Sequence, residues 1–212
     1  MSTAIELDAI PDIPDIRTGD DLASRLGDAL QMHGGLKDGD ILCIAHKVIS
    51  KAEGNVIDLD QVAPSEAARE LAATLNKNPA KVEVVLGQSS RVVRAFKRAE
   101  QNEGTLICEH RLGFISANAA VDESTTETDN TVITLPDDPD SSARRIGRAL
   151  QERFGVIIGI VVTDTFGRPW RLGQVNVAIG LHNVTAKTSD IGGVAAWGRH
   201  LSVPAPAFSG EL

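Results

Sequence analysis

The chain has 212 residues with 21 basic and 29 acidic side chains, which give a formal net charge of −8. Proteins that bind a nucleic-acid backbone normally show a basic face, which this acidic balance disfavours, so we expect no nucleic-acid partner. Hydrophobic residues make up 42% of the chain and aromatic residues 3%, which indicates a globular protein with an aliphatic core. The N-terminus does not resemble a signal peptide, and no apolar run is long enough to cross a bilayer. We therefore expect a cytoplasmic protein without a membrane partner.

Helical and extended patterns alternate along the chain. Capping residues and apolar periodicity predict a helix that begins at Leu22 and is ended by Gly34 and Gly35. They also predict helices over 66–76, 79–87 and 140–154, the last capped by Asp140. Apolar runs predict strands over 4–7, 41–49, 91–96, 105–108, 114–117, 129–135, 156–163 and 175–179. Several strands follow one another without an intervening helix. The pattern therefore favours a mixed α/β (α+β) fold, with mixed sheets and flanking helices.

The periodicity fades after Gly180, and residues 202–210 are rich in proline, serine and glycine. We predict one domain over residues 1–180, with a division into two subdomains left open. Residues 181–212 are predicted to form a divergent, partly disordered tail.

The segment 164–171, Asp-Thr-Phe-Gly-Arg-Pro-Trp-Arg, combines carboxylate, hydroxyl and guanidinium groups in eight residues. Asp164 follows a buried strand, where open α/β sheets place ligand-binding groups. Asp164 and Thr165 offer two hard oxygen donors, which suit Mg²⁺ or Mn²⁺. Arg168 or Arg171 could hold a substrate carboxylate. A structural interpretation stays open, with Asp164 closing a turn and the arginines on a solvated face.

Two further clusters carry charged groups that would complement such a site. Asp122 follows a run of small residues and is a second candidate metal ligand, although an aspartate there also suits a turn. Lys47 and Lys51 follow a predicted strand and could neutralise phosphate charge, or could be solvated strand-end residues. His46 precedes them and is more often a core histidine than a catalyst.

Two more basic pairs stand out. Arg144 and Arg145 oppose the dipole at the start of the predicted 140–154 helix, which calls for an acidic partner, with Asp137, Asp138 and Asp140 as candidates. His110 and Arg111 precede Gly113 and could be loop ligands, although no spacing argument supports them.

Taken together, these segments resemble the coenzyme F420-0:L-glutamate ligases, which attach γ-linked glutamate to a deazaflavin precursor using GTP. The matching stretches are residues 11–14, 19–22, 40–42, 46–54, 91–94, 110–114, 117–122, 135–146 and 164–171, in that order. The stretch 164–171 is the most specific, and the match runs from about Pro11 to Gly180. Two departures are Thr125 in place of the usual Asn and Ala120 in place of the usual Gly. Residues 181–212 do not resemble the family, so we expect a C-terminally truncated or divergent member whose activity could be impaired.

The resemblance implies an F420-0:gamma-glutamyl ligase-like fold in two parts and a homodimer. It implies Mg²⁺ or Mn²⁺ on Asp122, Asp164 and Thr165, with K⁺ as a further candidate ion. The residues expected to contact GTP are Pro11, Asp12, Ile13, Pro14, His46, Lys47, Lys51 and Thr125. Asp122, Asp164 and Lys51 are the expected catalytic residues.

The implied reaction is phosphoryl transfer from GTP to the terminal carboxylate of F420-0, followed by attack of the glutamate amine on the acyl phosphate. Two alternatives remain on the sequence alone. One is a catalytically impaired nucleotide- or metal-binding relic of such a ligase. The other is a metal-dependent phosphohydrolase.

Overall fold

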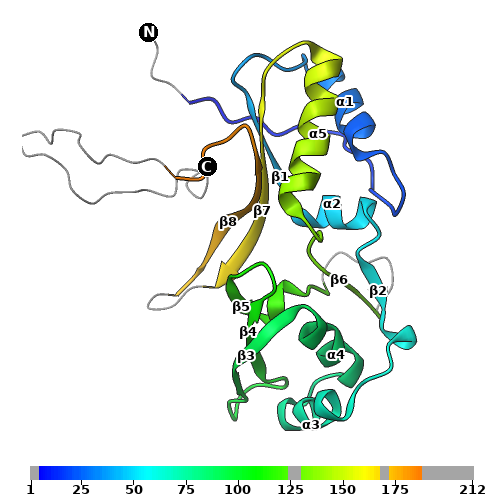
Figure 1. The fold of residues 1–212 in the computed structure, drawn as a ribbon, viewed down its shortest axis with the longest axis vertical. Helices are drawn as coiled ribbons and strands as arrows, with labels where there is room; N and C mark the ends of the chain where they lie inside the picture. Colours follow the sequence, from blue (N-terminus) through cyan, green and yellow to red (C-terminus); the bar gives the residue numbers. More distant parts are fainter. Residues whose placement is uncertain (1–4, 124–129, 168–171, 188–212) are drawn as a thin grey trace, which may run out of the picture.

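A computed structural model describes residues 5–123, 130–167 and 172–187. The protein is elongated, with two regions stacked along its long axis (Figure 1). We call residues 5–55 and 134–187 the upper region, and residues 56–123 and 130–133 the lower region. Each region has its own cluster of buried aliphatic side chains. The mixed α/β class predicted from the sequence is confirmed.

The upper region contains a three-stranded sheet in the order β1-β7-β8. Its strands are β1 (Ile41–Ala45), β7 (Gly159–Gly167) and β8 (Gln174–His182), and its long helices are α1 (Leu22–Met32) and α5 (Pro139–Phe154). β1 pairs with β7 in parallel and β8 pairs with β7 antiparallel. Helices α5 and α1 lie on one side of this sheet (Figure 1), where their apolar residues pack on buried strand residues.

The predicted strand over 41–49 is wrong in its second half, because residues 46–52 form the helix α2 (His46–Ala52). A continuous apolar run fits a buried strand or a helix equally well, and periodicity alone cannot separate them. In the helix, Ile49 is fully buried, while Lys47 and Lys51, four residues apart, share another face.

The lower region contains an antiparallel sheet in the order β3-β4-β5 and a smaller pair, β2-β6. The strands are β2 (Val56–Asp58), β3 (Ser89–Phe96), β4 (Thr105–His110), β5 (Ile115–Ala117) and β6 (Thr131–Ile133), and the helices are α3 (Glu66–Leu75) and α4 (Pro79–Gly87). Ser65 caps α3 and Asn78 caps α4, each through a side-chain oxygen that accepts a backbone N–H. Both helices pack against the core that β4 shares with the strand pair.

Several boundaries differ from the prediction. Residues 5–7 form no strand, and β2 was not predicted. The predicted strand 156–163 begins later and continues to Gly167, because β8 pairs with it beyond Asp164. Asp138, not Asp140, caps α5.

The predicted boundary at residue 180 lies within β8. Residues 188–212 of the predicted tail lie outside the described residues. Within the described part of the chain, no helix combines the length and apolar character needed to cross a membrane.

Candidate functional site

The first two residues of α2 each face one of the two candidate metal-binding aspartates. His46 Nε2 lies 3.4 Å from Asp164 Oδ1, and Lys47 Nζ forms an ion pair with Asp122. The His46 side chain is 2% exposed and that of Asp164 is 13% exposed, so this pair is largely shielded from water. Residues that are distant in the sequence therefore meet at one end of α2.

The sheet explains where Asp164 lies. The parallel pairing of β1 with β7 ends at Ala45 and Thr163, and the chain then leaves the sheet as α2. Asp164 is the next residue of β7, so it stands beside the turn from β1 into α2. The apolar run predicts Asp164 at the end of its own strand, but β7 continues to Gly167, and Asp164 lies beside the end of β1 instead.

Thr165 presents its hydroxyl elsewhere. It follows Asp164 within a strand, so its side chain points to the opposite face of the sheet. Its Oγ1 donates to Asn176 Oδ1 at 3.0 Å across β7 and β8. Its backbone N–H donates to Asp164 Oδ1 at 2.7 Å. The structure therefore brings the Thr165 backbone, but not its hydroxyl, to the Asp164 carboxylate.

Asp122 belongs to the lower region and is held from two sides. Its backbone N–H and C=O pair with Ile133 of β6, at 3.0 and 2.8 Å. The next residue, Glu123, forms an ion pair with Lys81 of α4, with 2.6 Å between Glu123 Oε2 and Lys81 Nζ. The Lys81 side chain is only 5% exposed. These contacts fix the backbone on both sides of the carboxylate that Lys47 engages.

A left-handed turn leads into Asp122. Asn118, Ala119 and Ala120 have φ values of 52°, 49° and 56°. A residue with a Cβ pays roughly 1–2 kcal/mol in this conformation. Such strain is retained where the surrounding structure fixes it, and it gathers near functional sites.

Other predicted residues are less closely tied to the pair. Lys51 lies one helical turn after Lys47 on the same face of α2, and no described acidic side chain lies within ion-pair distance of it. No hydrogen bond or ion pair among the described residues joins residues 11–14 to Asp122 or Asp164. Thr125, Arg168 and Arg171 lie outside the described residues.

His110 of β4 is fully buried near the site. Its Nδ1 accepts the backbone N–H of Leu112 at 3.0 Å. Burial lowers the pKa of His110 to about 4, with a further lowering from Arg111 and an opposing effect of the Asp164 carboxylate. The ring is therefore neutral at pH 7.

The contact between α2 and α5 was missed by sequence reasoning. Glu53 caps the C-terminal end of α2. Its carboxylate accepts a hydrogen bond from Ser142 of α5 and forms an ion pair with Arg145 of α5. None of the three candidate aspartates pairs with Arg145. The unfavourable position of Arg145 near the start of α5 indicated that it has an acidic partner. That partner is Glu53, which is distant in the sequence.

The gathered groups suit a divalent cation with phosphate. Carboxylate oxygens are hard donors, and Mg²⁺ is commonly bound by one or two carboxylates plus substrate phosphates. Asp122 and Asp164 provide the two carboxylates, and Lys47 and Lys51 provide positive charge beside them. The described residues contain no group of three or more His, Cys, Asp or Glu that would hold a metal alone. The donor set therefore fits a cation that the ligand helps to bind.

The fold and site define a mixed α/β protein in which acidic and basic side chains meet where two hydrophobic regions join. The family model for F420-0:Gamma-glutamyl ligase matches residues 11–212. The chain belongs to this F420-0:gamma-glutamyl ligase family. The match continues past residue 180, where the resemblance recognised in the sequence ended.

Curated relatives resemble the chain over most of its length. A coenzyme F420:L-glutamate ligase of Methanopyrus kandleri is 41% identical over 98% of this chain and 78% of the relative. The enzyme of the same name from Methanothermobacter thermautotrophicus is 38% identical over 98% of this chain and 80% of the relative. That of Archaeoglobus fulgidus is 34% identical over 98% and 79%, respectively.

Proposed function

We propose that this protein is a GTP-dependent ligase that adds γ-linked L-glutamate to F420-0, forming a carbon–nitrogen bond through an acyl phosphate. Membership of the family and the names of the relatives support the ligation of glutamate to the deazaflavin. The observation that carries the proposal is that Asp164 contacts His46 and Asp122 contacts Lys47, the first two residues of α2. The arrangement concentrates carboxylates and lysines, as phosphoryl transfer requires.

In the proposed reaction, a carboxylate oxygen of F420-0 attacks the γ-phosphorus of GTP, and the bond from that phosphorus to the β-γ bridging oxygen breaks to release GDP. The glutamate nitrogen then attacks the carbonyl carbon of the acyl phosphate. Inorganic phosphate leaves, and the nitrogen loses a proton as the amide forms. Each step redistributes negative charge on phosphate oxygens, so positioning and electrostatics carry most of the catalysis.

The chain's own residues have separate roles in this scheme. Asp122 and Asp164 would hold Mg²⁺ or Mn²⁺, which supplies charge neutralisation on the phosphates when bound. Lys47 can exchange its Asp122 partner for a phosphate oxygen, and Lys51 can do the same from the next turn of α2. His46, shielded from water, limits the orientations of the Asp164 carboxylate.

Further parts of the proposal come from the family resemblance. We include GTP contacts by residues 11–14, His46 and Thr125, a metal contact by Thr165, and K⁺ as an additional ion. We also include a homodimeric, cytoplasmic enzyme. Sedimentation of the full chain at several concentrations tests the dimer, and a monomer at all of them would contradict it.

Calorimetric titration of GTP into the full chain, with and without Mn²⁺, tests the site. We expect binding that requires the metal and weakens at least about 100-fold in Asp164→Asn. Asp28→Asn is the matched control, because Asp28 is an exposed aspartate of α1 that pairs with Arg153 in the last turn of α5. Binding that is independent of metal, or equal in both variants, would contradict the site.

Incorporation of isotopic glutamate into F420-0 tests the reaction itself. We expect incorporation that depends on GTP and metal and is accompanied by one GDP per glutamate. GTP binding without incorporation would point to the relic instead. Phosphate release from GTP without glutamate or F420-0 would point to the phosphohydrolase.

A further inference from the structure

Buried polar atoms without partners are concentrated in one short segment of the lower region. Within the described residues, four buried side-chain atoms lack a hydrogen-bond partner: His110 Nε2, Ser116 Oγ, Asn118 Oδ1 and His182 Nε2. Three of them lie between residues 110 and 118, directly before Asp122. Folded proteins rarely leave such atoms unpaired, and each exception needs an explanation.

His110 is the most informative of these residues because its protonation is determined by its contacts. Its Nδ1 accepts a hydrogen bond from the Leu112 backbone N–H, so in the neutral ring the hydrogen lies on Nε2. The side chain is fully buried, and no described residue accepts that hydrogen. The Nε2–H of His110 is therefore a buried donor without a hydrogen-bond partner among the described residues.

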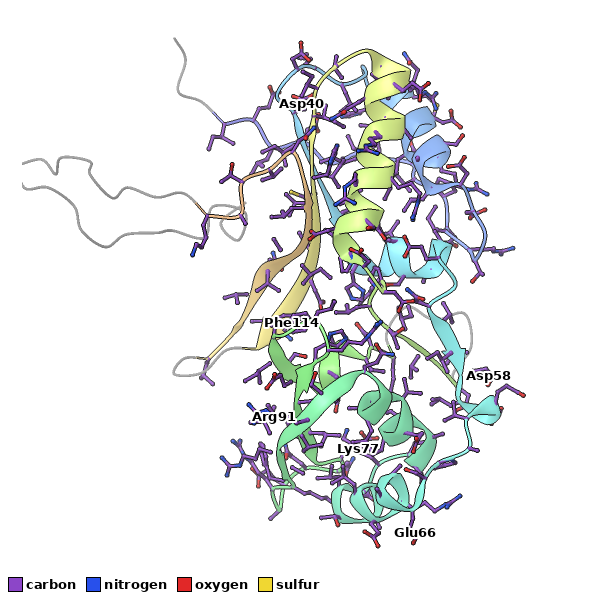
Figure 2. All side chains as sticks on the ribbon, viewed as in Figure 1. Asp40, Asp58, Glu66, Lys77, Arg91 and Phe114 are labelled. Atoms are coloured by element: carbon purple, nitrogen blue, oxygen red, sulfur yellow. The ribbon has the colours of Figure 1, made fainter. Side chains whose placement is uncertain are left out.

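A stack of rings connects His110 to the strand that carries Asp164. The His110 and Phe114 rings are parallel to within 2° with centroids 4.9 Å apart, and Phe114 packs on Phe166 at 4.6 Å. Figure 2 shows Phe114 at the top of the lower region, facing the ends of β7 and β8. Phe166 and Asp164 are two residues apart on β7 and so lie on the same face of the sheet.

The Asp164 carboxylate has an oxygen that can take this donor. Its Oδ1 accepts the Thr165 N–H and lies next to His46. No described residue engages its Oδ2. Asp164 is also close enough for its charge to act on the pKa of His110.

We propose that His110 is a positioning residue for Asp164. Its ring, through Phe114 and Phe166, sets the place of β7, and its Nε2–H donates to the Asp164 carboxylate when that carboxylate binds a divalent cation. Hydrogen bonds from a second layer of residues orient metal-binding carboxylates in this way. The role in metal binding rests on the proposed function, but the nearness of the unpaired His110 Nε2–H to the Asp164 charge does not.

Nuclear magnetic resonance of the full chain labelled with ¹⁵N-histidine tests whether the His110 ring lies beside the Asp164 carboxylate. We expect His110 to remain the neutral Nε2–H form from pH 8 to pH 5.5. Its Nε2 and Nε2–H resonances should shift in Asp164→Asn and stay in place in the control Asp28→Asn. An unchanged His110 signal in Asp164→Asn would overturn the proposal.

Two substitutions separate the donor from the ring. His110→Phe keeps a stacking ring without a donor, whereas His110→Gln keeps a donor near the Nε2 position without a ring. Measured by electron paramagnetic resonance of free Mn²⁺, the Mn²⁺ affinity with GTP present should fall about 10-fold or more in His110→Phe. His110→Gln should retain it within about threefold, and the exposed-residue control His33→Gln should match the wild type.

The turnover of the variants provides a second readout. In His110→Phe we expect kcat to fall with little change in the KM for glutamate, and raised Mn²⁺ should restore part of kcat. Equal Mn²⁺ affinity in His110→Phe and wild type would overturn the proposal, as would an equal loss in His110→Gln and His110→Phe. If the wild type binds no Mn²⁺, the proposed function fails in its metal requirement, and the resonance experiment still decides whether the His110 ring lies beside Asp164.

Discussion

The upper and lower regions are built from similar aliphatic cores but differ in how completely their polar groups are paired. Around α2 and α5 in the upper region, His46 contacts Ser50, and Ser142 contacts Glu53. His182 Nε2 is the one buried side-chain atom of this region, among the described residues, that has no hydrogen-bond partner. In the lower region, the segment 110–118 leaves buried polar atoms unpaired and leads into the left-handed turn before Asp122. Both features cost stability.

This difference indicates that the two regions contribute to the candidate site in different ways. The upper region, which has fewer unpaired buried polar atoms, holds Asp164 and the start of α2, and the lower region brings Asp122 to them on a strained turn. The candidate site therefore lies where the upper region meets the lower region, in which more buried polar atoms lack hydrogen bonds.

The two cores should be equally well packed. Leu150→Ala in the upper region and Leu106→Ala in the lower region each remove a fully buried side chain. Each should lower the free energy of unfolding by about 2–5 kcal/mol, because a cavity remains where the side chain packed. Urea unfolding measures the change. A cost below about 1 kcal/mol at Leu106 alone would mean that the lower core is loosely packed.

His110 should make the lower region sensitive to acid. The folded-state pKa is about 4, because burial disfavours the charged ring, while an unfolded histidine titrates near 6.5. Between these values the unfolded chain binds a proton that the folded chain does not. Stability from His110 is therefore complete above about pH 6.5 and is lost as the pH falls toward 4.

Between pH 7 and pH 4.5 this difference amounts to roughly 2 kcal/mol. Carboxylates such as Glu103, whose pKa is lowered mainly by a hydrogen bond from Lys77, also lose stability in acid. The measurement is therefore the difference between wild type and His110→Phe in urea unfolding at the two pH values. The same loss in both proteins would show that His110 does not contribute.

The left-handed turn should be relieved by glycine. Ala120 has a φ of 56°, which glycine adopts without the Cβ penalty. Ala120→Gly should raise the free energy of unfolding by about 0.5–1 kcal/mol, and the matched control Ala117→Gly, at a φ of −69°, should lower it. Thermal unfolding compares the two variants. Destabilisation by Ala120→Gly would argue against strain at this turn.

Helix caps should behave alike in the two regions, because capping is local. Asp21 caps α1 by accepting the Ser24 N–H at 3.1 Å, and Ser65 caps α3 by accepting the Ala68 N–H at 3.2 Å. Asp21→Ala and Ser65→Ala should each cost about 1 kcal/mol. Ser65 also donates to Glu83, so a larger loss there would measure that second contact.

The sequence by itself determined the features that depend on neighbouring residues. The ends of α3 and α4 were predicted because Ser65, Asn76 and Pro79 act within one helical turn. The segment 164–171 identified the family, since an eight-residue run of such specificity is rare. The same run and the lysines of α2 also located most of the candidate site.

Tertiary structure decided what depends on distant partners. Residues 46–49 became a helix because Ile49 enters the upper core from that conformation and β1 stops at Ala45. Arg145 found Glu53 instead of a nearby aspartate, and Asp164 faces His46 because the parallel strand beside it ends one residue earlier. Local patterns carry no signal for such pairings, because their free energy appears only when segments far apart in the chain pack together.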